Sequence, residues 1–196
     1  MDKFWAWWAL VFYILPVFIA IPLIRRRRRG VNYLLTGVAL RYDGAVKSIV
    51  GVPYYVGFDL DGIPVSLSLS YPGRRSPAQT SLAVEMDSPF AVEVSIGAED
   101  GLPAFGKRWG SQDIDIIRPE FDSDFVVRGP EKNPIREFLT ADLQSLFLKW
   151  RRQRVTLSIK NKSLRFTVYE LIDEDERLDE FISDARTVLV KASGRG

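Results

Sequence analysis

The first part of the chain is continuously apolar, a pattern that predicts a membrane-spanning helix. Residues 4–24 carry no charge. At about 1.5 Å per residue, a helix of this length spans roughly 30 Å, the thickness of the hydrocarbon core of a bilayer. Tryptophans gather at its start and two prolines interrupt it, both of which spanning helices tolerate. These residues are Trp5, Trp7, Trp8, Pro16 and Pro22. We therefore expect residues 1–24 to form a short tail and a transmembrane helix.

Five consecutive arginines follow the apolar run and predict its orientation. They are Arg25, Arg26, Arg27, Arg28 and Arg29. Because positively charged flanks stay on the cytoplasmic side, we expect a single-pass protein with its N-terminus outside and a cytoplasmic domain over residues 31–196. The polybasic segment 25–30 is also expected to attract anionic lipids, by about 1 kcal/mol per basic residue near the surface. The alternative is that these arginines only fix the topology.

Beyond Gly30 the apolar residues become periodic, first with the spacing of a helix. This spacing is shown by Val31, Leu34, Leu35, Val38 and Tyr42. It predicts a short amphipathic helix. We expect this helix either to cap the domain or to lie on the membrane surface.

Between residues 46 and 117 the period changes to two, which predicts strands. The clearest pair flanks Asp61-Gly62, a dipeptide typical of two-residue hairpin turns. From Val65 on, apolar residues alternate strictly with serine, as a half-exposed strand requires. Strands are expected over residues 54–60, 63–71, 81–86, 90–96, 113–117 and 121–127.

The last third of the chain predicts helices and one further hairpin. Asn133, Pro134 and Thr140 are good residues for helix starts, and the hairpin joins residues 155–159 to 164–168. Two apolar stripes follow helical spacing: Leu139, Leu143, Leu146, Phe147 and Trp150, then Leu178, Phe181, Ile182, Ala185, Val188 and Leu189. The chain is therefore expected to be α+β: one transmembrane helix, then an antiparallel β-meander with two or three helices on one face.

Composition narrows the possible chemistry. Residues 30–196 contain 21 of the 27 basic and 24 of the 25 acidic residues, so their net charge is −3, which argues against nucleic acid as a partner. The chain has no cysteine and no histidine. These absences exclude disulfides, thiolate catalysis, imidazole bases and the common zinc sites. No catalytic residue and no cofactor is predicted.

A cationic cluster surrounds one tryptophan near the end of the first helical stripe. Its members are Lys149, Trp150, Arg151, Arg152 and Arg154. Such a cluster is a candidate contact for a lipid headgroup or for a partner protein. The alternative is the solvated end of a helix with one aromatic residue in the core.

An acidic cluster is the other candidate site. Asp113, Asp115, Glu120, Asp122 and Asp124 lie within twelve residues. On strands, i, i+2 spacing places neighbouring carboxylates on one face, and such oxygens suit calcium or magnesium. Asp113, Asp122 and Asp124 are the metal candidates; the alternative is the solvated face of a strand.

One stretch of the chain resembles a known family. Phe121-Asp-Ser-Asp-Phe-Val-Val-Arg-Gly129, a helix containing residues 138–143, and the hairpin over residues 155–168 are similar to an uncharacterised bacterial family of single-span, membrane-anchored domains. The resemblance implies a bacterial origin, and with the predicted topology a place in the inner membrane. It implies no activity and no catalytic residues.

Two functions are compatible with these patterns. The first is a non-catalytic accessory or structural subunit, not an enzyme, anchored by one span and docked on a larger respiratory or photosynthetic membrane complex. Its partners would be integral-membrane protein subunits and anionic lipids, with the domain on the cytoplasmic face. The second is a membrane-tethered, metal-dependent enzyme or ligand sensor that uses the acidic cluster within residues 113–124.

Overall fold

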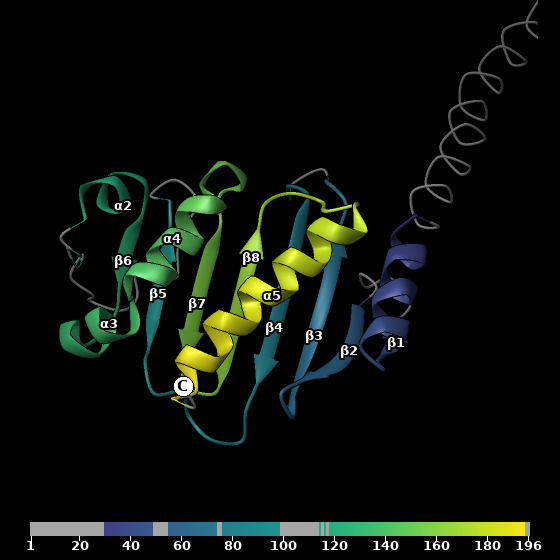
Figure 1. The fold of residues 1–196 in the computed structure, drawn as a ribbon, viewed down its shortest axis with the longest axis horizontal. Coiled ribbons are helices and arrows are strands. Elements are labelled where there is room, and N and C mark those ends of the chain that lie inside the picture. The colour runs from purple at the N-terminus through teal and green to yellow at the C-terminus, as the bar shows by residue number, and fades with distance from the viewer. Residues whose placement is uncertain are drawn as a thin grey trace, which may run out of the picture.

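The computed structural model describes residues 30–48, 55–73, 76–98, 114, 116 and 118–194. In this part of the chain, eight strands form one sheet in the order β1-β2-β3-β4-β8-β7-β5-β6, and every neighbouring pair is antiparallel (Figure 1). The strands are β1 (Ala45–Lys47), β2 (Tyr55–Leu60), β3 (Ile63–Ser70), β4 (Gln79–Glu85), β5 (Val94–Gly97), β6 (Val126–Arg128), β7 (Thr156–Lys160) and β8 (Ser163–Val168).

The helices come before the sheet, between its strands and after it. An N-terminal helix covers residues 30–41. The others are α2 (Pro119–Asp124), α3 (Lys132–Phe138), α4 (Ala141–Lys149) and α5 (Asp175–Ala192), with a 3₁₀ turn, η2, at Arg151–Gln153. Figure 1 shows α5 running diagonally across one face of the sheet, with α4 beside it and the N-terminal helix near β1. The expected α+β class is confirmed.

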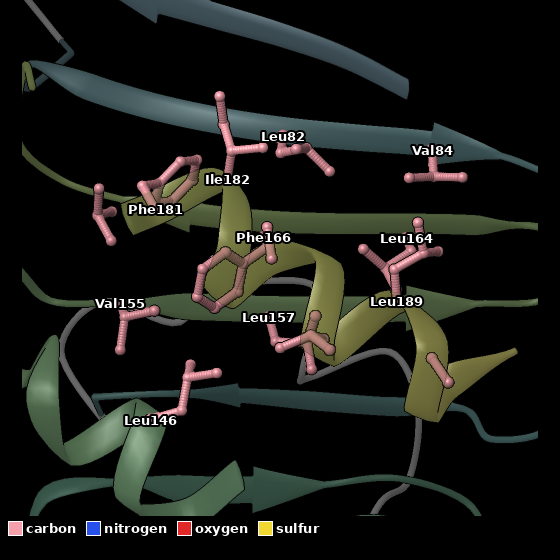
Figure 2. Close-up of a cluster of buried hydrophobic side chains, with 14 of the residues drawn as sticks. Leu82, Val84, Leu146, Val155, Leu157, Leu164, Phe166, Phe181, Ile182 and Leu189 are labelled. Carbon is pink, nitrogen blue, oxygen red and sulfur yellow. The ribbon is translucent and has the colours of Figure 1, made fainter. Parts of the chain in front are cut away.

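The core lies between that face and the helices. Alternate residues of β4, β7 and β8 point toward α5 and interlock with its apolar stripe (Figure 2). Phe166 is fully buried, and its ring centroid lies 6.1 Å from that of Phe147 in α4 and 5.3 Å from that of Phe181 in α5. Both predicted helical stripes of the C-terminal third are buried.

The N-terminal helix caps the domain. Val31, Leu35 and Val38 are buried in the common core. At the end of the helix, Arg41 forms ion pairs with Asp175 and Asp179 of α5, at 3.1 and 3.2 Å. Of the two expected positions for this helix, capping the domain is therefore the one observed.

The expectation of a single-pass membrane protein is corrected by the structure. Among the described residues, no helix combines the length and the apolar character that crossing a membrane needs. The longest, α5, has 18 residues and bears acidic and basic side chains along its outer side. The predicted span itself, residues 4–24, lies outside the described residues, as do its Trp5, Trp7, Trp8, Pro16 and Pro22 and the five arginines that follow. The predicted inner-membrane location, with the N-terminus outside and a cytoplasmic domain, is not supported.

The sheet also departs from the expected meander. Strands β1 to β4 do follow one another, but β8 pairs with β4 and β7 pairs with β5, so the late hairpin lies between two early strands. Thr80 and Ser81 help to hold it: Thr80 Oγ1 donates to the Glu170 carbonyl at 2.9 Å, and the Ser81 and Thr167 hydroxyls are 2.8 Å apart. Local periodicity in the sequence cannot predict pairing between strands that are far apart along the chain.

The hairpin predicted at Asp61-Gly62 is confirmed, and it carries a prediction about pH. Both residues have positive φ, 54° and 74°, as its tight turn requires. Arg186 of α5 binds the Asp61 carboxylate through two nitrogens, at 2.7 and 2.5 Å. This hydrogen bonding lowers the pKa of Asp61.

We therefore expect an NMR titration to give Asp61 a pKa below its ordinary value. Because the folded-state pKa is lowered, the stabilisation is complete above the ordinary aspartate pKa of about 3.9 and is lost as the pH falls through the folded-state pKa. In Arg186→Gln the pKa of Asp61 should return to the ordinary value. An unchanged pKa of Asp61 in Arg186→Gln would show that the hydrogen bonds from Arg186 do not lower it.

Candidate functional site

Three residues of the acidic cluster, Glu120, Asp122 and Asp124, lie on a short helix instead of a strand. Residues 119–124 are helical, with Pro119 at the first position, so the strand predicted over residues 121–127 is shortened to β6. Asp122 accepts hydrogen bonds from the backbone N–H groups of Ile116 and Arg118, at 3.1 and 3.2 Å, while Asp124 pairs with Arg151 at 3.6 Å.

Asp113 and Asp115 lie outside the described residues. In the part of the chain that the structure does describe, no group of three or more carboxylates is placed to hold a metal ion. Asp122 and Asp124 are thus held by local structural contacts.

Two members of the cationic cluster, Lys149 and Arg151, pair with acidic residues of the domain itself. Lys149 Nζ lies 2.8 Å from a Glu180 oxygen and 2.6 Å from an Asp184 oxygen, which also accepts the Trp150 indole N–H at 2.7 Å. Burial lowers the pKa of Lys149, but hydrogen bonds and charges of Asp184 and Glu180 outweigh it, so the pKa rises. Trp150 is 2% exposed.

Arg151 pairs with Asp124 of α2, and Arg152 is exposed next to it. Arg154, also exposed, ends η2 in a left-handed conformation with φ of 50°. The arrangement fits a helix end with one aromatic residue in the core, which was the alternative interpretation of this cluster.

The face of the sheet opposite the core carries small polar side chains. The alternation of β3 places Ser66, Ser68 and Ser70 on it, and the register brings Ser81 and Ala83 of β4 beside them. Ser66 Oγ donates to the Ala83 carbonyl at 3.3 Å, and Ser68 Oγ donates to the Ser81 carbonyl at 3.4 Å. The hydroxyl groups are therefore hydrogen-bonded to the neighbouring strand and do not project from the face, which stays flat.

A groove crosses this open face from β1 to β8. Cross-strand pairing aligns Ala45, Gly57, Ser66 and Ala83 in one row, with Arg165 at its end. Because the first four side chains are the smallest on their strands, the row forms the floor of an open groove of about 720 Å³. Gly44 allows the close approach of β1 to β2, since a Cβ atom there would lie 2.6 Å from the Gly57 carbonyl oxygen.

Charged residues border the groove, and within the described part of the chain they have no partners of their own. Its lining includes Lys47, Asp59, Glu85 and Arg165. None of the hydrogen bonds or ion pairs within the described ranges uses these four side chains. On the helical face, by contrast, Arg41, Lys149, Arg177 and Arg186 are all paired. The groove thus combines charges that have no partner among the described residues with an uncharged centre.

An exposed apolar strip lies near the same edge of the sheet. Tyr33 and Leu40, seven residues apart on the N-terminal helix, are 76% and 81% exposed, and Val46 of β1 is 38% exposed. Residues at this spacing share one face of a helix. The strip and the groove together make the β1 side the best candidate for an interaction surface.

Sequence reasoning predicted the half-exposed strand but missed the groove. The alternation of serine with apolar residues in β3 was its only local signal. The row of small residues arises from positions 45, 57, 66 and 83, which are aligned by register alone.

Comparison with models of known protein families found no match, and no curated protein is significantly similar to this chain. The resemblance drawn from residues 121–129 thus stays a prediction. The function below is inferred from the geometry of the open face.

Proposed function

We propose that this protein is a non-catalytic subunit that docks on a partner protein through the open face of its sheet. The observation that supports this most is the groove, an uncharged floor of small residues bordered by free charges. Interfaces commonly combine an uncharged centre with a polar rim. A strand glycine such as Gly57 often marks a position that a ligand or another backbone can approach closely.

The shape of the face also favours a macromolecular partner. The groove is open and shallow, whereas sites for small molecules are concave and bury most of their ligand. The serine hydroxyls on this side of the sheet are engaged with neighbouring strands, at 2.8 to 3.4 Å for Ser66, Ser68 and Ser81. They offer a surface to pack against and no activated nucleophile.

The test introduces large side chains on the open face of the sheet. In the double variant Ser66→Arg/Ser68→Arg, two long charged side chains would stand in the middle of the docking surface. We expect at least a tenfold loss of the partner that co-purifies with the full chain under mild conditions, measured by quantitative mass spectrometry. Because both side chains point away from the core, the circular dichroism spectrum and the melting temperature should stay close to those of the parent.

Two controls match this variant. Ser183→Arg introduces one arginine at an exposed position of α5, on the helical face, and should keep the partner. Ser66→Ala/Ser68→Ala keeps the side chains on the face small and should also retain the partner. Equal recovery of the partner with the double arginine variant and with Ser183→Arg would refute docking through this face.

A further inference from the structure

The two sides of the groove differ in charge. On one side of the groove, an acidic wall is formed by Asp43, Asp59 and Glu85. Asp59 of β2 lies opposite Pro64 of β3. Because Val65 of β3 pairs with Val84 of β4, Glu85 lies on the other side of Pro64. Asp43 lies two residues before Ala45 in the chain, and Ala45 is opposite Gly57 of β2. All three acidic side chains are exposed. No basic residue interrupts this wall in the groove lining.

We infer that the partner presents an extended segment with basic side chains on one side, bound along this acidic wall. This inference rests on the proposed docking function and names the chemistry of its partner. From β1 to β4 the wall crosses three strand spacings, about 14 Å. In an extended segment, residues i, i+2 and i+4 share one side and also cover about 14 Å. Alternating lysine or arginine residues cover the same span, and their long side chains can reach the three carboxylates.

The basic residues of the groove determine which side chains the bound segment can carry on its other side. Lys47 lies across from the wall beside Tyr55, and Arg165 closes the far end. These two cations repel a segment that is basic all round, so the basic residues must alternate with uncharged ones. Pro64, between Asp59 and Glu85, offers an apolar ring against which the methylene stems of lysine or arginine pack.

The same charges exclude phosphate-bearing partners from this site. A nucleic acid or an anionic lipid headgroup would bring negative charge against three free carboxylates. Exposed ion pairs are weak singly, about 0.2–1 kcal/mol each, so several must act together. They are also screened by salt, which makes ionic strength a useful variable.

The test uses the full chain and a fluorescent nine-residue peptide of alternating lysine and serine, with binding followed by anisotropy at low salt. A peptide of the same composition with its lysines in one block should bind at least fivefold more weakly, and an alternating glutamate–serine peptide should not bind. Asp59→Lys/Glu85→Lys should weaken binding of the alternating peptide at least tenfold. Glu137→Lys/Glu176→Lys changes the net charge equally at exposed positions of α3 and α5 and should leave binding unchanged.

Failure of this inference can be separated from failure of the docking function. If the alternating peptide does not bind, or binds equally to both double lysine variants, the basic segment is wrong. If Asp59→Lys/Glu85→Lys keeps the native partner while Ser66→Arg/Ser68→Arg loses it, the basic segment is again wrong and docking stands. If both of these variants keep the native partner, both proposals fail.

Discussion

Replacing Phe166 with alanine is expected to lower the free energy of unfolding by about 3–5 kcal/mol, the usual cost of removing a buried phenylalanine. Phe166 is fully buried in β8, and its ring meets Phe147 of α4 and Phe181 of α5. The substitution thus removes the contact that joins both helices to the centre of the sheet. The measurement is urea denaturation followed by circular dichroism.

The neighbouring Arg165 supplies the control for this prediction. Arg165 lies on the same strand, but its side chain points to the open face. Arg165→Ala should change the free energy of unfolding by no more than about 0.5 kcal/mol, as is usual for exposed positions. A loss below 1 kcal/mol in Phe166→Ala, or equal losses in the two variants, would contradict the burial of Phe166 between the sheet and the two helices.

The second large effect is expected at Asp184, a residue that no sequence pattern singled out. Its carboxylate accepts the indole N–H of the buried Trp150 at 2.7 Å and binds Lys149 at 2.6 Å. Asp184→Ala leaves that N–H without an acceptor, and a buried unsatisfied donor costs about 1–3 kcal/mol. Urea denaturation should therefore show a loss of about 2 kcal/mol.

Two variants separate the indole hydrogen bond from the ion pair. Asp184→Asn keeps an oxygen acceptor and should recover part of the loss. Glu180→Ala removes only the exposed pair with Lys149, at 2.8 Å, and should cost less than about 1 kcal/mol. Equal losses in Asp184→Ala and Glu180→Ala would mean that the indole contact contributes nothing.

Elements whose signal is local were predictable from the sequence. The Asp61-Gly62 turn, the alternation in β3 and the apolar stripe of α5 each depend on residues a few positions apart. Their start and end points differ by only a few residues from those expected: β4 is Gln79–Glu85 where residues 81–86 were predicted. Helix α3 begins at Lys132, with Glu131 as its N-cap, just ahead of the expected Asn133.

Features that depend on distant pairing were not predictable. The place of β7 and β8 between β4 and β5 is set by contacts such as Leu82↔Phe166 and Ile96↔Leu157, which join residues at least sixty positions apart. The partners of Lys149 lie on α5, far along the chain, so the cationic cluster resembled a binding patch. The groove arises in the same way, because no segment of the sequence contains its floor.

The segment around Pro119 shows how a local pattern can mislead. The acidic residues there alternate as on a strand, but Pro119 begins a short helix, and Asp122 accepts two backbone N–H groups in the same region. Proline is favoured at the first position of a helix. For Asp122 and Asp124 the metal interpretation assumed a strand, and residues 119–124 are helical instead.

Site-specific photo-crosslinking tests the docking function most directly. A photoreactive phenylalanine analogue is placed at Ser68 on the open face, or at Ser183 on the helical face, in cells that make the protein naturally. Docking through the open face predicts one discrete adduct with a partner from Ser68 and none from Ser183. No adduct from Ser68, or the same adduct from both positions, would contradict it.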